Sequence, residues 1–410
     1  MKFPFMVRAI IATLWLQISV ATAWLSLPAL APQIAMGTGI PALRIVEASG
    51  LLFVGAIIPT LAVSPIIARL GPIRIFQLGT LLAAAGVLVV EIGRPWAVIL
   101  GAIIIGAGYG PGTPSASAVL ACHTNPQMRS LVFSIKQSGV PIGGFLAGLT
   151  LPGIAIAIGW HWAISAVAMF CVLSALWIGM WRRELDRDLI DPEIRIQPRE
   201  LIRSLHLLPT LRLHPDLPRI TFHSFAAASF QSGIVAILTT FLVQDGGITG
   251  LQAGLIFSLT NIAGAIGRIG FGLLADRIIS PQALLAALPL PALASILTLV
   301  IFGSALPFFA IMLLGILFGL TGAGWNGVLI GEIASLAPSG AVSRVSASSL
   351  PFMFAGYLVG PVITGGLVEL FNSYLLGVLP TGVMMLWCSC WYLIKCHLIT
   401  IHTSTSESPT

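Results

Sequence analysis

Two basic side chains interrupt stretches of the sequence that are otherwise apolar. Lys136 stands in "SIKQSG", about two turns, or roughly 9 Å, into an apolar segment if that segment is helical. Arg268 stands in "AIGRIGFG", two turns before Asp276. Each side chain could offer a cation to an anionic solute. Each could equally extend along the apolar layer and place its charge at the edge.

Uncharged polar side chains occur in similar apolar segments. A polar group in apolar surroundings is costly, which makes it a candidate for solute binding. The more frequent role of such a group is a hydrogen bond between neighbouring helices. The residues concerned are Gln17, Trp24, Tyr109, Gln137, Gln231, Asn261, Trp325 and Asn326.

The sequence lacks the clustered groups that catalysis, metal binding or ATP hydrolysis would need. The acids nearest to apolar segments lie near their ends, and no "GxxxxGK[ST]" phosphate loop occurs. The five cysteines have no metal-site spacing. We therefore predict no enzyme, no cofactor and no metal site. His223 could carry a coupling proton, although a histidine at the edge of an apolar layer is the commoner case.

Composition identifies the surroundings of the chain. Of its 410 residues, 57% are hydrophobic and 8% are charged, and the mean hydropathy is +1.00. A soluble protein carries roughly a quarter charged residues. We therefore expect most of the protein surface to face the lipid bilayer instead of water. The net charge of +6 comes from basic residues in short loops rather than from an aromatic-rich basic patch, so we expect no nucleic-acid partner.

Hydropathy predicts six membrane spans, a polar interval and six more spans. We expect an N-terminal bundle over 1–181, a linker over 182–218, a C-terminal bundle over 219–398 and a disordered tail over 399–410. "ATA" at 21–23 also fits a signal-peptide cleavage site, but we interpret the first apolar segment as an uncleaved helix. The predicted spans are 9–30, 46–68, 76–92, 96–119, 131–153, 160–181, 219–243, 250–274, 282–303, 306–330, 345–369 and 374–397.

The basic residues predict the orientation of these spans. One side receives both termini and the even-numbered connections, and the other side receives only Arg44 and Arg94. Because basic residues accumulate on the cytoplasmic side, both termini are predicted to be cytoplasmic. The crowded side carries Lys2, Arg8, Arg69, Arg74, Arg129, the arginines of the linker, Arg277, Arg344 and Lys395.

The two halves of the chain repeat each other. "ARLGPIR" corresponds to "ADRIISP", "GAGYGPGTPSAS" to "GLTGAGWNGVLIGE", and "KQSGVPIGGFLAG" to "AGYLVGPVITGGL", in the same order. Because each half has an even number of spans, the halves share one orientation and are related by an axis along the membrane normal. This pattern predicts two pseudo-symmetric six-helix bundles in an all-α membrane protein of twelve transmembrane helices.

These motifs resemble those of the major facilitator superfamily. "GFGLLADRI" resembles the C-terminal copy of its loop motif, and "GAGYGPGTP" and "GYLVGPVITGG" resemble its glycine-rich fourth and eleventh helices. The sequences of the fifth and tenth predicted helices are loosely similar to those of bacterial permeases in the cyanate and nitrate transporter neighbourhood. The resemblance implies a multi-pass protein of the bacterial inner membrane that works by alternating access. It also implies that the first, fourth, seventh and tenth helices line the cavity, which favours Gln17, Tyr109, Gln231 and Asn326.

The resemblance further implies a gate. Asp276 would face the start of the eleventh helix, where Arg344 stands, and Arg277 and Glu332 would complete a charge cluster. The N-terminal copy has Ser64 and Ala68 at the glycine and aspartate positions, so a carboxylate latch cannot form there. Arg69 and Arg129 are further candidate gating residues. Alternatively, Arg277 has no gating role and only reflects the accumulation of basic residues on the cytoplasmic side, and Asp276 is solvated.

The leading hypothesis is a secondary transporter for a small solute. Lys136 and Arg268, with no acid at the same depth, favour a small organic or inorganic anion. Efflux of apolar compounds is the alternative within transport, and a membrane receptor that does not transport is the alternative outside it. We expect a monomer with a small-molecule substrate and a proton as one candidate coupling ion.

Overall fold

The computed structural model describes residues 2–191, 193 and 207–406. These residues form helices and connecting loops and contain no strand. Twelve helices in the described ranges are long and apolar enough to cross a membrane. The all-α fold with twelve spans is therefore confirmed.

The first six spans form one bundle. Three of them are divided by short irregular breaks, as expected from the glycine and proline residues in their sequences. The helices are α1 (Lys2–Thr38), α2 (Ala42–Gly50) with α3 (Leu52–Leu70), α4 (Pro72–Val90), α5 (Pro95–Tyr109) with α6 (Gly112–His123), α7 (Arg129–Gln137) with α8 (Gly139–Ile158), and α9 (Trp160–Asp186). The short helices η1 (Pro126–Met128) and η2 (Arg187–Leu189) precede α7 and follow α9.

The last six spans form the second bundle. One short helix, α11 (Leu207–Leu211), precedes it within the expected linker; residues 194–206 of that linker lie outside the described residues. The helices are α12 (Leu217–Gln244), α13 (Gly250–Arg277), α14 (Pro281–Ala287) with α15 (Pro289–Phe302) and η3 (Gly303–Ala305), α16 (Phe308–Ser335), α17 (Val342–Phe371) and α18 (Tyr374–Ser406).

The last helix runs further than the sequence indicated. Helix α18 ends at Ser406, so residues 399–406 are helical where we expected a disordered tail. Residues 407–410 of that tail lie outside the described residues.

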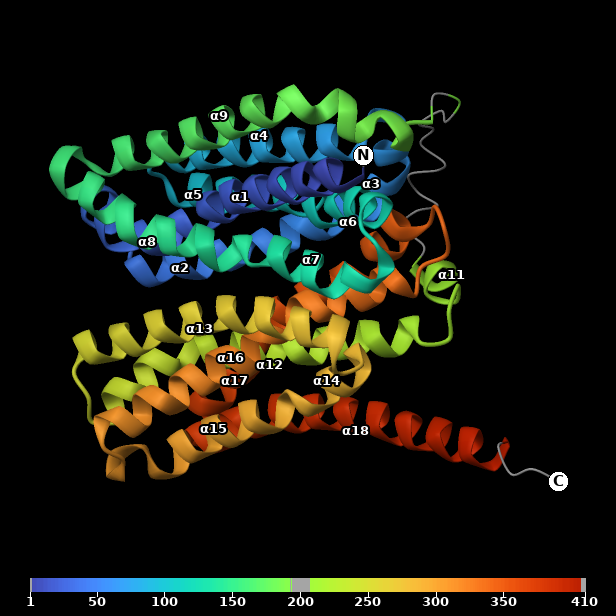
Figure 1. Cartoon of the computed structure of the whole chain (residues 1–410). Helices are drawn as coiled ribbons and strands as arrows, with labels where there is room; N and C mark the ends of the chain where they lie inside the picture. Colours follow the sequence, from blue (N-terminus) through green and yellow to red (C-terminus); the bar gives the residue numbers. More distant parts are fainter. Residues whose placement is uncertain (1, 192, 194–206, 407–410) are drawn as a thin grey trace.

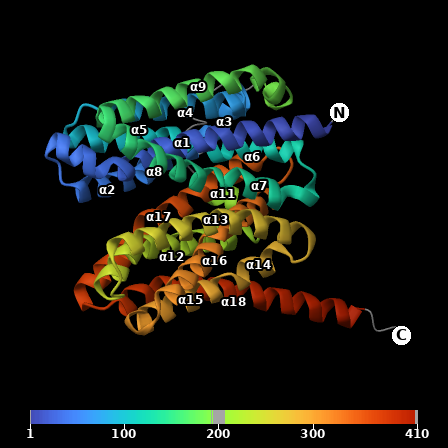
Figure 2. The same cartoon turned by 60° about the vertical axis from the view of Figure 1, so that its left-hand side comes forward.

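Figure 1 shows the two bundles as two layers, with α1 to α9 in one and α12 to α18 in the other. Both α1 and α18 have their free ends on the same side of the molecule, and Figure 2 shows the same arrangement from another direction. We call this side the terminal end and the other side the opposite end. An even number of spans places the two ends of the chain together.

Close helix contacts hold each bundle together, and small residues make them possible. In the first bundle Gly143 of α8 lies against Ile18 and Ala21 of α1, and a Cβ atom at Gly143 would clash with both. In the second bundle Gly360 of α17 lies in the same way against Ser229 of α12. The two contacts occupy equivalent places in the repeat, which supports the pseudo-symmetry read from the sequence.

Candidate functional site

A chain of hydrogen bonds begins at Lys136 and crosses from one bundle to the other. The Lys136 ammonium donates to Thr113 Oγ1 at 2.9 Å and to Gln137 Oε1 at 2.7 Å. The Gln137 amide then donates to Asn326 Oδ1 on α16. Since Lys136, Thr113 and Gln137 belong to the first bundle and Asn326 to the second, this chain lies at the interface.

The chain of hydrogen bonds continues among three helices of the second bundle. The Asn326 amide lies 3.2 Å from the hydroxyl of Tyr357 on α17. That hydroxyl lies 3.5 Å from Gln231 Oε1 on α12, which also accepts from Trp325 Nε1 at 3.1 Å. Asn326 makes a further contact of 3.4 Å with Met353 Sδ. The polar groups at this depth thus satisfy one another.

Arg268 makes a second connection between the bundles, and a proline explains it. Pro141 has no N–H, so the carbonyl of Gln137, four residues earlier, loses its partner in the helix. Helix α7 ends at Gln137, and this carbonyl accepts from Arg268 Nη1 at 2.7 Å. Arg268 Nε also donates to the carbonyl of Ala323 at 3.1 Å. The guanidinium is therefore fixed between α7 and α16.

The site carries two positive charges without an acidic partner among the described residues. Lys136 is 1% exposed and Arg268 is 6% exposed, and the ion pairs of the described residues involve neither of them. An ammonium has three donors and a guanidinium has five, whereas two acceptors are found for each side chain. Spare N–H groups and uncompensated positive charge therefore remain at the interface.

Aromatic rings adjoin the charged groups. Arg268 is near enough to Tyr109 and Tyr357 to interact electrostatically with both hydroxyls. Tyr109 contacts Trp24 with ring centroids 6.0 Å apart, and Gln17 lies within hydrogen-bonding reach of the Tyr109 hydroxyl. The Phe76 ring lies 5.9 Å from Lys136 Nζ, in the range of a cation–π contact.

The structure thus brings together the two predicted cations and seven of the eight uncharged candidates for solute binding. Asn261 stands apart because it is exposed and donates to the carbonyl of Phe257 within its own helix at 2.9 Å. Sequence reasoning missed Thr113, Met353 and Tyr357. Tyr357 could have been recognised as a site candidate, because it is a single tyrosine in the glycine-rich "AGYLVG". A threonine or methionine in an apolar helix is not distinctive enough to indicate a site residue.

The predicted partner of Asp276 was wrong. Its carboxylate does not face the start of the eleventh span but accepts from the backbone N–H groups of Ser130 at 3.0 Å and Leu131 at 2.7 Å. Both groups belong to the first turn of α7, where N–H groups have no partner inside the helix and carry partial positive charge. Asp276 therefore caps a helix of the other bundle.

The charge cluster expected around Asp276 also differs. Glu332 is 6% exposed and accepts from the Gln282 amide and from Ser335 Oγ instead of an arginine. Arg277 and Arg344 are exposed, as is Arg69. Arg129 stands at the first position of α7, next to the Asp276 cap. Among the expected gating residues, Asp276 joins the bundles through its hydrogen bonds to α7.

The N-terminal copy of the loop motif uses different contacts. Ser64, at the glycine position of this copy, lies with its Oγ 3.2 Å from that of Ser343 in the first turn of α17. Asp186, which sequence reasoning did not single out, accepts from the N–H groups of Ile73 at 2.7 Å and Arg74 at 3.1 Å. It therefore caps α4 within its own bundle.

A serine fills a narrow space between the bundles at the terminal end. Ser134 of α7 lies against Gly272 of α13 and Gly327 of α16, and a Cβ atom at either glycine would clash with it. Gly331, one turn further along, lies close to the Ser130 backbone, and a Cβ atom there would come within 3.1 Å of Ser130 Cα. The terminal end is closed by direct backbone approach.

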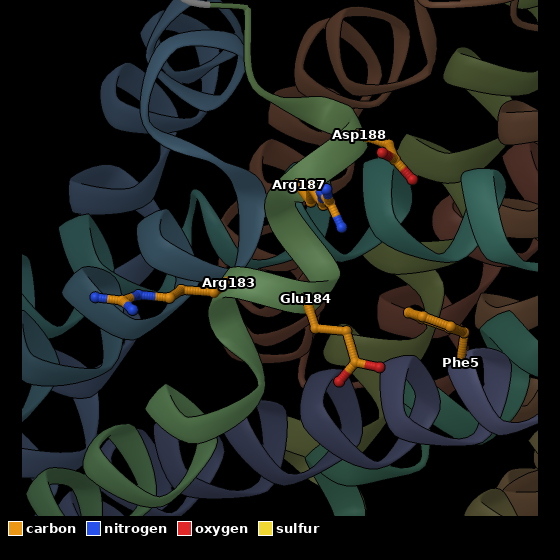
Figure 3. A pocket seen from close by; sticks show the side chains of 5 residues that line it. All are labelled: Phe5, Arg183, Glu184, Arg187 and Asp188. Atoms are coloured by element: carbon orange, nitrogen blue, oxygen red, sulfur yellow. The ribbon is translucent and has the colours of Figure 1, made fainter.

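A separate pocket opens at the terminal end of the first bundle. It has a volume of about 520 Å³ and is lined by Phe5, Arg183, Glu184, Arg187 and Asp188. Figure 3 shows Phe5 and Glu184 on neighbouring helices, with Arg183 directed away from them. Glu184 is already paired with Arg8 at 2.6 Å. The mixed and partly paired charges favour no particular ligand.

Comparison with known proteins identifies the fold. The model of the Major Facilitator Superfamily matches residues 12–348. The chain belongs to this superfamily. A curated relative, an MFS-type transporter of Gibberella moniliformis, is 25% identical over 308 residues, which cover 73% of this chain and 69% of the relative. The hexuronate transporter of Bacillus subtilis is 22% identical over 188 residues, which cover 43% of this chain and 42% of the transporter.

Solved structures agree with the superfamily assignment. The human organic anion transporter MFSD10 (TETRAN) superposes with a TM-score of 0.72 at 17% identity, covering 95% of this chain and 98% of that one. At this identity the similarity speaks for the fold alone. The protein is thus a multi-pass membrane protein with the fold of a Major Facilitator Superfamily transporter.

Proposed function

We propose that the protein moves a small organic or inorganic anion across the bacterial inner membrane by alternating access. The observation that carries this proposal is the position of Lys136 and Arg268. Both are buried at the interface of the two bundles, both keep N–H groups without an acceptor, and no described carboxylate pairs with them. An anion would supply the missing charge and acceptors.

The place of the two cations suits transport. An anion bound there would touch both bundles at once, because Lys136 belongs to α7 and Arg268 to α13. Separation of the bundles on either side would then expose the site to that side alone. A bound anion also lowers the cost of burying two like charges.

Basic residues support an orientation with the terminal end in the cytoplasm. Arg8, Arg69, Arg74, Arg277 and Arg344 stand at that end, as positive-inside topology requires. The hydrogen bonds between the bundles described above also lie toward that end. In this orientation the closed terminal end is the cytoplasmic side, and the site would receive solute from outside once the bundles separate at the opposite end. We propose a monomer, with a proton as one candidate coupling ion.

The names of two similar proteins agree with an anionic solute. The Bacillus subtilis relative is a hexuronate transporter and the human structure is an organic anion transporter. Their identities of 22% and 17% make these names supporting rather than deciding evidence. Lys136 and Arg268 therefore remain the main support for an anionic solute.

Ligand-induced thermal stabilisation of the purified protein tests the proposal. Acetate, benzoate, glucuronate, nitrate and phosphate would be compared with neutral glucose and cationic choline. A ligand at a hundred times its dissociation constant stabilises the folded state by about 2.7 kcal/mol. We expect at least one anion to raise the melting temperature of the wild type and of Arg94→Met, and to have no effect on Lys136→Met.

Arg94→Met is the matched control because Arg94 is an exposed cation at the opposite end. Stabilisation by glucose or choline alone would contradict the proposal. So would an anion effect that persists in Lys136→Met, or the absence of any anion effect. Stabilisation by apolar neutral compounds alone would favour efflux of such compounds.

A further inference from the structure

We propose that the transported anion is an aromatic carboxylate, whose carboxylate binds Lys136 and Arg268 and whose ring inserts between Phe53 and Tyr357. This inference rests on the proposed anion transport and names the substrate class of the same site. It follows from the arrangement of the aromatic rings next to the two cations.

The rings form a connected layer at the interface. Phe53 contacts Trp24 with centroids 5.3 Å apart and Phe354 with centroids 5.8 Å apart. Tyr109 contacts Trp24 at 6.0 Å and Phe354 at 5.9 Å, which closes a ring of four side chains. Trp24, Phe53 and Tyr109 come from the first bundle, and Phe354 comes from the second. The layer is therefore shared by the parts that must move.

This layer lies beside the cations, toward the opposite end. Lys136 is about 10 Å along α7 from its first residue and Phe354 is about 18 Å along α17, at 1.5 Å per residue. Both helices begin at the terminal end. Because Arg268 is near enough to Tyr109 and Tyr357 to interact with both hydroxyls, a carboxylate joined to a ring directly, or through a short link, can contact the guanidinium and the ring layer at once. An inorganic anion would occupy the charged part alone.

One contact of the layer has the geometry that a planar ligand can replace. Phe53 and Tyr357 lie face to face across the interface, with centroids 5.2 Å apart and ring planes 22° apart. When the bundles separate on the opposite side, this stack must open. A flat aromatic ring entering between the two faces would keep the stacking contact with each side chain.

The polar side chains beside the rings argue against a hydroxyl-rich anion. Gln137, Asn326 and Gln231 are engaged with one another and with Tyr357 and Trp325. A sugar acid would bring several hydroxyl groups that need partners of their own, and unpaired buried hydroxyls are costly. Spare donors that suit a carboxylate belong to Lys136 and Arg268.

Equilibrium binding to the purified full-length protein tests the inference. The probes are benzoate, acetate, glucuronate and benzyl alcohol, with nitrate as the inorganic anion. We expect benzoate to bind at least about tenfold more tightly than acetate, because burial of a ring-sized apolar group is worth that much or more. We expect glucuronate, nitrate and benzyl alcohol to bind no better than acetate.

Variants locate the two parts of the site. Phe53→Leu conserves apolar character and should weaken benzoate binding by roughly 3- to 10-fold while leaving acetate unchanged, since it removes the stacking face. Phe309→Leu, at a position 62% exposed on α16, is the matched control and should change neither. Lys136→Met should abolish binding of both carboxylates.

The outcomes separate this inference from the proposed function. If acetate, glucuronate or nitrate binds as tightly as benzoate, and Lys136→Met abolishes that binding, the aromatic class is wrong and anion transport stands. If Phe53→Leu leaves benzoate binding unchanged, the ring does not insert there and the inference is wrong. If benzyl alcohol matches benzoate and Lys136→Met has no effect, or if no anion binds, both proposals are wrong.

Discussion

Asp276 at the end of α13 accepts a hydrogen bond of 3.0 Å from the backbone N–H of Ser130, in the first turn of α7. The two residues belong to different bundles, so this cap exists only while the terminal end is closed. The same carboxylate also accepts from Leu131. Asp276 thus couples the capping of one helix to the contact between the two halves of the transporter.

A cross-link reports on this closure. Ser64 and Ser343 face each other across the bundles with hydroxyls 3.2 Å apart, which places cysteine sulfurs at these positions close to disulfide geometry. In a background without the five native cysteines, Ser64→Cys with Ser343→Cys should form a disulfide rapidly under mild oxidation. The rate of its formation measures the population of the closed terminal end.

Replacement of the cap should slow the cross-link. Loss of an N-cap costs about 0.5–2 kcal/mol, and here the loss falls on the closed state alone. Asp276→Ala should therefore reduce the cross-linking rate by about 2- to 30-fold. Asp245→Ala, at an exposed carboxylate at the other end of the bundle, should not change it. An unaltered rate in Asp276→Ala would show that the cap does not hold the terminal end.

Added volume at Gly272 should open the same end. A Cβ atom there would clash with Ser134 of the other bundle, whereas a Cβ atom at Gly270, two residues earlier, meets open space. Gly272→Ala should slow the cross-link and Gly270→Ala should not. Adding Ser134→Gly to Gly272→Ala should restore the rate in part, because it removes the two Ser134 atoms that clash, whereas the carbonyl oxygen of Ser130 remains 2.8 Å from the added Cβ atom. Equal effects of the two alanines would refute this packing argument.

The cap provided by Asp186 should behave differently from that of Asp276. Its hydrogen bonds to Ile73 and Arg74 remain within the first bundle and are therefore expected in every state of the transport cycle. Asp186→Ala should lower the melting temperature, in line with a cap worth about 0.5–2 kcal/mol, and leave the cross-linking rate unchanged. A slower cross-link in this variant would mean that the α4 cap also depends on the closed state.

Pro141 should control the position of Arg268. Because the proline lacks an N–H, the Gln137 carbonyl is free to accept from Arg268. Pro141→Ala would supply a competing N–H in the helix, and we expect weaker anion binding with little loss of thermal stability. Pro152→Ala, in the same helix but about 16 Å further along it at 1.5 Å per residue, is the control. Equal anion affinity in wild type and Pro141→Ala would disprove the link.

Much of the fold could be predicted from the sequence because lipid imposes a simple rule. Long apolar runs must be helical to satisfy their backbone in a membrane, and the repeated motifs revealed the two halves. The extension of α18 to Ser406 could not be predicted from "HTSTSESPT". Hydropathy detects apolar segments, and it does not indicate whether a helix continues into polar residues beyond the membrane.

The site was predictable in its charges and not in its pairings. The cost of burying a charge marked Lys136 and Arg268 as candidates for solute binding, with extension to the edge of the apolar layer as the alternative, and both lie at the interface. The prediction for Asp276 was wrong because it paired the residue with a helix of its own bundle. The packing of α13 against α7, which sets the true partner, cannot be read from the sequence. Asn261 was indistinguishable by residue type from Asn326, and only the rotation of its helix separates an exposed amide from an interfacial one.

Flux through proteoliposomes tests most directly the claim that an anion crosses between the bundles at Lys136 and Arg268. The protein would carry the Ser64→Cys and Ser343→Cys pair, and the solute would be the labelled anion that stabilises it best. The account predicts uptake by the reduced protein, loss of uptake on oxidation, recovery on reduction, and no uptake when Lys136→Met is added. Uptake that survives the cross-link, or that is equal with and without Lys136, would contradict it.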